Sequence, residues 1–237
     1  MAHQTIHPSI LYFGTPVVLI GTRNEDGTSN LAPISSAWWL GWNCVLGFGA
    51  HSKTPQNLRR TRMCTLNLPS VLQVSKVDKL ARLTGSDPVP PGKQTKGYTF
   101  CADKFGASGF TEDRAELVDA PVVRECPVQM EAELTESHVL TPEIKGSLVA
   151  LEVRILRVRA RAEVLMDGER DRIDPDRWRP LMMSFCRFYG LGEEVHASRL
   201  AEIPEALYRP QRVQAMLDEL DDEAAEARGL SHKWVKR

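Results

Sequence analysis

A short apolar run that leads directly into a helix start constrains this chain more than any other feature. Residues 45–49 read as a buried strand, and the polar segment 50–57 follows without a break. Within that segment Thr54 is a good N-cap residue, and Pro55 suits the first helical position. We therefore expect a strand that turns sharply into a helix, with the helix beginning just after Thr54.

The same corner contains groups that bind anions. A helix N-terminus presents unpaired N–H groups and a partial positive charge. Ser52 and Thr54 add hydroxyl groups, and Lys53 adds a full charge. A phosphate is the simplest ligand for such a corner. An ordinary capped helix with a surface lysine would have the same sequence, and this segment alone favours that simpler interpretation.

The sequence upstream of the corner reads as a β-hairpin. Residues 16–22 are apolar and β-branched, an Asp-Gly turn follows, and residues 30–36 form the returning strand. Pro33 cannot donate to a sheet ladder, so we expect it at an edge or a bulge. Ser35 and Ser36 place two hydroxyl groups where the strand ends. Together with the corner, this hairpin has the pattern of a mononucleotide-binding cradle.

Further strand candidates complete a mainly β pattern. Residues 64–68, 127–134 and 148–159 have strand character, and the last segment changes the phase of its alternation near Leu156, which indicates a β-bulge. Residues 86–121 have a weak pattern, from which we expect loops and short helices that cover something. Strands at these spacings do not fit a βαβ ladder and favour a barrel over a doubly wound sheet.

The character of the sequence changes beyond Asp167. Residues 174–178 begin a helix pattern, residues 200–207 form another that Pro204 interrupts, and residues 212–228 form a third with an acidic, solvated face. We expect one domain over residues 1–166. A helical C-terminal extension over residues 167–237 should pack on that domain or on a partner subunit.

Composition and the lack of standard motifs exclude several classes of function. The net charge is −1 and the pI is near 6.6, so a general nucleic-acid or acidic-membrane surface is not expected. No apolar run approaches a membrane span, and we expect a soluble, cytoplasmic protein. Rossmann, P-loop, zinc-protease and Gly-x-Ser-x-Gly motifs are absent, and we expect no metal. The cysteines form no CxxC pair and are expected mostly as small buried hydrophobes: Cys44, Cys64, Cys101, Cys126 and Cys186.

Two histidines and a tryptophan cluster are the other candidate side chains. His51 lies inside the proposed cradle, where it would contact a bound ring or phosphate or serve only as a polar strand end. His138 follows a strand near a barrel rim and would contact substrate or lie on a surface loop. Trp38, Trp39 and Trp42 would stack on a planar ligand, anchor a dimer interface or join the core, and we favour a structural role for at least two.

The order and spacing of these segments resemble the flavin reductase-like proteins, which are FMN-binding split β-barrels, and among them the longer flavoredoxin-like branch. The resemblance covers roughly residues 8–160, and residues 189–199 resemble the C-terminal arm of longer relatives. The matching segments are residues 16–22, 26–36, 52–58 and 64–69, then Asp103-Lys104-Phe105-Gly106 with Gly109, then Pro121 and Glu125-Cys126-Pro127.

The resemblance implies a fold and a set of cofactor contacts. The fold would be a six-stranded antiparallel split barrel with flanking helices, forming a homodimer with FMN at the interface. The loop Ala50, His51, Ser52, Lys53 and Thr54 would hold the phosphate, with Asn57 nearby. Asn30, Pro33, Ser35 and Ser36 would line the ribityl chain and the ring edge, partly through backbone groups. The flavin itself would perform the redox step.

One departure from the family pattern bears on the electron donor. Many short flavin reductases have Gly-Asp-His before a late strand, where this chain has Glu136-Ser137-His138 and an apparent insertion at residues 141–146. His138 is therefore the candidate catalytic residue, contacting the reductant or the acceptor. The resulting hypothesis is an FMN-dependent oxidoreductase that moves electrons from NAD(P)H to free flavin, an electron-transfer partner or a small organic acceptor. The alternative is a non-enzymatic flavin-binding electron carrier or flavin store.

Overall fold

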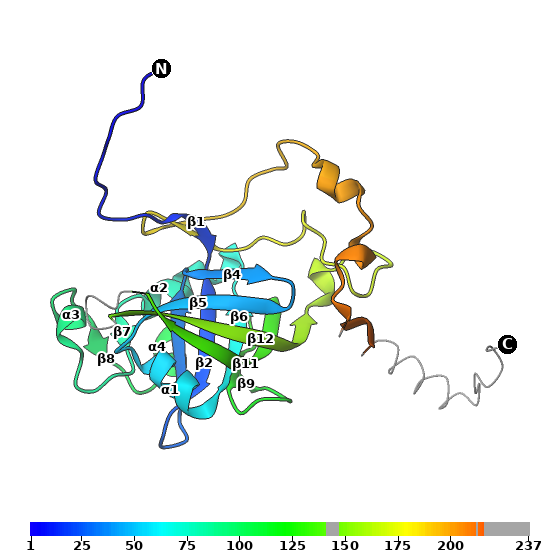
Figure 1. Ribbon diagram of the computed structural model, residues 1–237. Helices are drawn as coiled ribbons and strands as arrows, with labels where there is room; N and C mark the ends of the chain where they lie inside the picture. Colours follow the sequence, from blue (N-terminus) through cyan, green and yellow to red (C-terminus); the bar gives the residue numbers. More distant parts are fainter. Residues whose placement is uncertain (141–146, 212, 216–237) are drawn as a thin grey trace, which may run out of the picture. The chain divides into compact units, whose positions relative to one another are not determined.

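The predicted strands assemble into one antiparallel sheet. The structure, a computed structural model, describes residues 1–140, 147–211 and 213–215. The strands of this sheet pair in the order β3-β2-β6-β11-β12-β5-β4 (Figure 1). In chain order they are β2 (Val18–Arg23), β3 (Ser29–Ile34), β4 (Ala37–Leu40), β5 (Asn43–Gly49), β6 (Met63–Leu68), β11 (Val128–Val139) and β12 (Leu148–Ala160).

The two edges of this sheet are consecutive in the chain. Only Ser35 and Ser36 separate β3 from β4, so the end of one edge strand must lie close to the start of the other. The carbonyl oxygen of Ser36 also accepts a hydrogen bond of 2.7 Å from the N–H of Gly47 in β5. The sheet therefore curls back on itself without closing, which is the split-barrel arrangement expected from the sequence.

The sheet has seven strands rather than the expected six. The additional strand is β4, which falls in the segment that the sequence analysis read only as an aromatic cluster. Trp39 and Trp42 pack against the core inside the sheet, whereas Trp38 is 56% exposed. The structural role expected for at least two of the three tryptophans is confirmed.

The β-bulge predicted near Leu156 is present. Glu131 pairs with Arg157 while the next residue, Ala132, pairs with Ile155, so Leu156 is the extra residue. A bulge of this kind bends its strand and increases the local twist. It lies in the middle of β12, one of the two long central strands, where bending helps the sheet to curl.

The strand β2 is buried on both faces. Val18 and Ile20 belong to the core cluster inside the curled sheet, together with Leu58 of helix α1 (Lys53–Thr61). Leu19 belongs to a second cluster outside it, which also contains residues of α2 (Val74–Leu80) and α4 (Lys104–Ser108). This double burial explains why the segment reads as a continuous apolar run instead of an alternating one.

The weakly patterned segment 86–121 and its borders contain the expected short helices, and also short strands that were not expected. They are β7 (Leu83–Thr84), α3 (Pro91–Gln94), β8 (Thr99–Phe100), α4, β9 (Glu112–Arg114) and β10 (Pro121–Val123). The strands β7 and β8 pair in parallel, and β9 and β10 pair antiparallel. The short helix η1 (Val71–Gln73) precedes α2.

The beginning of the C-terminal extension differs from the expected helix. Residues 174–178 form a single turn, closed by a hydrogen bond from the N–H of Trp178 to the carbonyl of Asp174 (2.9 Å). Pro180 stops the turn because it disfavours helical backbone at the preceding residue. A hairpin of β13 (Met182–Ser184) and β14 (Arg187–Tyr189) follows and pairs with β1 (Phe13–Pro16).

The chain divides by its internal contacts into two units, Met1–Glu193 and Glu194–Arg237. The hairpin β13–β14 thus belongs to the first unit, with the short helix η3 (Ala162–Val164). The described part of the second unit contains η4 (Arg199–Glu202) and η5 (Glu205–Tyr208), which flank Pro204 as predicted. Most of the acidic helix predicted at residues 212–228 lies outside the described residues. The division at residue 166 stays a prediction.

All five cysteines are free, and three of them are buried as expected. Burial raises the pKa of the Cys44 thiol to about 12, and it also raises the pKa of the Cys64 and Cys126 thiols. Cys101 is half-buried and Cys186 is exposed. Within the described residues, no helix is long and apolar enough to cross a membrane.

Candidate functional site

The corner between β5 and α1 has the form expected from the sequence, but the helix begins earlier. Its first residue is Lys53, and Ser52 is the N-cap, with extended backbone at φ −78° and ψ 151°. The expectation of Thr54 as the N-cap was wrong. Pro55 is tolerated at the third helical position because the N–H groups of the first turn have no partner within the helix in any case.

The first turn of α1 retains its capacity to bind an anion. The Ser52 hydroxyl makes no capping hydrogen bond, and the first turn contains no acidic residue. The Lys53 ammonium lies 3.6 Å from a carboxylate oxygen of Glu25, which is itself mostly exposed. The helix dipole and the lysine charge therefore act together at this end of α1.

A buried network of polar side chains lies beneath the corner. Asn30 Nδ2 donates to the Thr22 hydroxyl (3.0 Å) and to the Thr54 hydroxyl (3.1 Å). Asn57 Nδ2 donates to the Thr22 hydroxyl (3.2 Å) and to Asn24 Oδ1 (2.8 Å). The side chains of Asn30, Thr54 and Asn57 are all buried, so three predicted site residues meet here to position the corner.

Lys104 joins this network from α4, although the sequence analysis gave it no role. Its ammonium donates to Asn30 Oδ1 at 3.0 Å, and the residue is only 4% exposed. Burial, with a smaller contribution from the nearby Lys93 charge, lowers the pKa of Lys104 to about 8. The only sequence signal was the family segment Asp103-Lys104-Phe105-Gly106.

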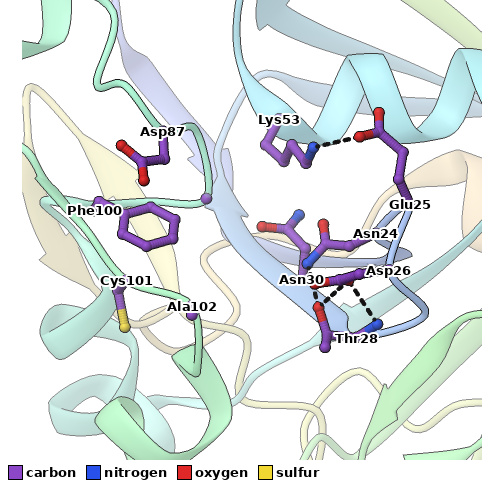
Figure 2. A pocket seen from close by; sticks show the side chains of 11 residues that line it. Asn24, Glu25, Asp26, Thr28, Asn30, Lys53, Asp87, Phe100, Cys101 and Ala102 are labelled. Carbon is purple, nitrogen blue, oxygen red and sulfur yellow. Dashed lines mark hydrogen bonds and ion pairs between the residues drawn. The ribbon is translucent and has the colours of Figure 1, made fainter.

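A cleft of about 240 Å³ opens beside the corner (Figure 2). One wall is the turn between β2 and β3 together with Lys53, and the other comes from the segment 85–102. The weakly patterned segment, which was predicted to cover another part of the protein, thus forms one wall of the cleft. Figure 2 shows these side chains facing one another across it: Asn24, Asn30 and Lys53 on one side, and Asp87, Phe100 and Cys101 on the other.

Gly85 lies where the cleft borders the buried network, and its lack of a side chain permits close packing there. A Cβ at this position would lie 2.7 Å from Asn30 Oδ1 and 3.3 Å from Lys53 Cγ. A larger residue would therefore displace the side chains that connect the corner to Lys104. The cleft residues from this loop were missed in the sequence because they lie in its least patterned segment.

The predicted residues at the end of β3 lie away from the buried network. Pro33 is on an edge strand, where its missing N–H is tolerated, and it pairs with Leu19. Ser35 is half-buried and Ser36 is exposed. A Cβ at Gly47 would approach the Ser36 Cβ to 2.9 Å, so the glycine permits this close crossing of the strands.

Neither histidine belongs to the cleft. His51 is exposed, and its carbonyl oxygen accepts a hydrogen bond from Gln56. His138 is exposed on β11, where it pairs with Ala150, and Ala150 in turn pairs with Gly47. The three residues form one row across the sheet, so His138 lies on the same face as the crossing at Gly47 rather than beside Lys53.

Comparison with known proteins places this arrangement in a family. The family model described as "Flavin reductase like domain" matches residues 10–187. This chain belongs to that family. It is also 36% identical over 192 residues to the uncharacterized protein YdfE of Bacillus subtilis (strain 168), a match that spans 81% of this chain and 91% of that protein.

Solved structures of the flavin reductase-like family share the fold. Flavoredoxin of Desulfovibrio vulgaris (Miyazaki F) superposes with a TM-score of 0.69 at 20% identity, covering 85% of this chain and 100% of that chain. An FMN-binding domain of a flavin reductase-like enzyme from Shewanella baltica OS155 gives a TM-score of 0.58 at 18% identity, covering 77% of this chain and 89% of that chain. The split-barrel fold and a flavin-related redox function follow from membership of the family.

The corner fits the phosphate group of a flavin mononucleotide. The chain supplies a helix N-terminus, an uncommitted Ser52 hydroxyl and the Lys53 charge in one place. The residues predicted to hold the phosphate are thus mutually compatible.

Proposed function

We propose that this protein is an FMN-dependent oxidoreductase that moves electrons from NAD(P)H to free flavin, an electron-transfer partner or a small organic acceptor. The observation that carries the proposal is the first turn of α1, with its uncapped N–H groups and Lys53 above a buried polar network, in a chain of the flavin reductase-like family. A bound flavin would supply reversible hydride and electron transfer. The protein would work in the cytoplasm.

The chain's own residues would bind and orient the cofactor. Lys53 and the N–H groups of the first turn would hold the phosphate, and the Thr54 hydroxyl, which already accepts from Asn30, would donate its hydrogen to it. Pro33, Ser35 and Ser36 would line the ribityl chain and the ring edge. His138 would contact the reductant or the acceptor.

We further propose a homodimer with the flavin at its interface. The strand β4 supports this, because it is an edge of the sheet formed by the described residues, and Trp38 and Leu40 on it are 56% and 73% exposed. Exposed apolar residues on an open edge strand favour association with another chain. The C-terminal extension would contribute to the same interface.

The first test is the visible absorption spectrum of the purified protein after FMN is added, followed by anaerobic NADH or NADPH. Bound flavin bands that bleach would support an enzyme with direct nicotinamide access. Failure to bind FMN at all would overturn the proposed function.

The substitution Lys53→Glu tests the assigned site. It replaces a positive charge at the phosphate with a negative one, so we expect FMN affinity to fall about 100-fold or more, as for the loss and reversal of a charge-assisted contact. Fluorescence titration would measure it. Lys79→Glu, at an exposed position on α2, is the control. Tight FMN binding by Lys53→Glu would show that the phosphate lies elsewhere.

A second candidate function is a flavin-binding electron carrier or flavin store. The replacement of Gly-Asp by Glu136-Ser137 before His138 favours it, because that segment approaches the nicotinamide in relatives. Steady-state oxidation of NADH or NADPH with excess free FMN discriminates the two. Turnover supports the enzyme, whereas flavin that only a protein partner reduces supports the carrier.

A further inference from the structure

Lys104 is a buried cation that the proposed function does not yet use. It is 4% exposed, and the structure records no ion pair between it and any described carboxylate. A lysine so deeply buried destabilises the fold unless an opposite charge or good hydrogen bonds compensate it. Its single recorded acceptor is a neutral amide oxygen, Asn30 Oδ1, at 3.0 Å.

The ammonium fixes the orientation of the Asn30 amide. Because an ammonium group can only donate, the Asn30 atom that faces Lys104 must be the oxygen. The Asn30 NH₂ group must then point away from Lys104, toward the Thr22 and Thr54 hydroxyls. The orientation of this amide is thus determined by chemistry as well as by geometry.

The orientation of Asn30 in turn determines what Thr54 can do. The Thr54 oxygen accepts from Asn30 Nδ2 at 3.1 Å, so its own hydrogen is available to donate. Thr54 lies in the first turn of α1, next to Lys53. A donor hydroxyl, a lysine and a helix N-terminus would then face the same anion.

We propose that Lys104 is a positioning residue for the cofactor phosphate, acting through Asn30 on Thr54 and balanced in charge by the bound phosphate. This inference rests on the proposed function, because it concerns the phosphate of the same flavin site. It extends that site from the surface corner to a residue on α4, 74 positions away from Asn30 in the chain.

Few charged or titratable groups surround Lys104. Lys93 of α3 and the Cys101 thiol act on it electrostatically, and β3 contributes the neutral Asn30. Helix α2 packs beside α4, but Lys76 is paired with Glu125, and the side chains of Asp78 and Lys79 are exposed. A dianionic phosphate would therefore be the main counter-charge near the ammonium.

The decisive variant is Lys104→Met, which keeps the length of the side chain and removes its charge. We expect FMN affinity to fall about 10- to 100-fold, as for a lost charge-assisted contact. Affinity for riboflavin, which lacks the phosphate, should change less than about threefold. Lys79→Met, at an exposed position on α2, is the matched control and should bind both flavins like the wild type.

Proton uptake provides a readout that a purely structural role would not change. Calorimetric titration with FMN at pH 8.5, in two buffers of different ionisation enthalpy, should detect uptake by the wild type because a bound phosphate favours the charged lysine. The phosphate is already a dianion at this pH and contributes no uptake of its own. Lys79→Met should retain the uptake, and Lys104→Met should lose it.

The outcomes separate the two proposals. Equal losses of FMN and riboflavin affinity in Lys104→Met, or no proton uptake by the wild type, would overturn the role of Lys104 while leaving the flavin site intact. The wild-type measurement decides even if Lys104→Met does not fold. A wild type that binds neither flavin would overturn the proposed function, and the role of Lys104 with it.

Discussion

Single residues in this protein act through what they can donate or accept. Asn30 is the clearest case, because it uses both amide hydrogens and its oxygen on Thr22, Thr54 and Lys104. Substituting any one of these partners would leave a buried polar atom without a hydrogen bond, at a cost of about 1–3 kcal/mol. Residue identity at this site is therefore set by hydrogen-bond chemistry rather than by size.

The pH dependence of stability follows from Lys104. Its pKa is lowered by burial from 10.5 to about 8 in the folded protein, so the unfolded chain binds more protons between these values. Stability of the flavin-free protein should therefore rise with pH across this window, by about 2 kcal/mol from this group between pH 8 and 10. Urea unfolding of the wild type and Lys104→Met at both pH values measures it. Between pH 8 and 10 the free energy of unfolding should rise more for the wild type than for the variant. Equal changes in the two proteins would contradict the prediction.

At the level of the elements, a buried carboxylate joins β11 to the loop that precedes β10. Glu131 is 2% exposed, and its Oε2 accepts hydrogen bonds from the backbone N–H groups of Glu116, Leu117 and Val118, at 3.0, 2.6 and 3.3 Å. Residues 116–118 lie between β9 and β10, outside both strands. One side chain on the sheet thus accepts from three consecutive backbone N–H groups of this loop.

Removal of this carboxylate should destabilise the fold strongly. Glu131→Ala leaves three backbone donors unpaired and a cavity behind, so we expect a loss of about 3 kcal/mol or more in unfolding free energy. Glu133→Ala is the matched control, because Glu133 pairs with Arg154 at a solvent-accessible position and should cost about 1 kcal/mol or less. Urea midpoints of the two variants measure the difference. Similar values would contradict a stabilising role for the Glu131 carboxylate.

At the scale of the whole molecule, the two edges of the curled sheet differ in what they expose. The edge strand β3 lies beside the cleft through Asn30, whereas β4 exposes Trp38 and Leu40. An open edge with large apolar side chains is an aggregation hazard unless another chain covers it. The proposed homodimer would remove this hazard.

The double substitution Trp38→Lys and Leu40→Lys tests that association. Both side chains are largely exposed, so the monomer should remain folded while the positive charges oppose pairing of two edges. Light scattering after size-exclusion chromatography should show a dimer for the wild type and a monomer for the variant. A dimeric variant would place the interface elsewhere, and Lys79→Glu serves as a surface-charge control.

Much of the fold was predictable because its signals are local. The six expected strands, the bulge at Leu156 and the corner that begins α1 each follow from neighbouring residues. The strand β4 and the hairpin β13–β14 were missed because they are short, carry no alternation and are held by distant partners. The helix start was misplaced by two residues, since Ser52 and Thr54 are both good caps and only backbone geometry distinguishes them.

The sequence by itself determined the residue types of the phosphate corner, because Ser52, Lys53 and Thr54 are adjacent and their chemistry needs no other part of the chain. Only the tertiary structure decided that Lys104 meets Asn30 beneath that corner. The contact joins a helix in the least patterned segment to an edge strand 74 residues earlier. It depends on how the sheet curls and on how that segment packs against the sheet. Local patterns specify strands and turns, whereas a contact of this separation is set by packing of the whole domain.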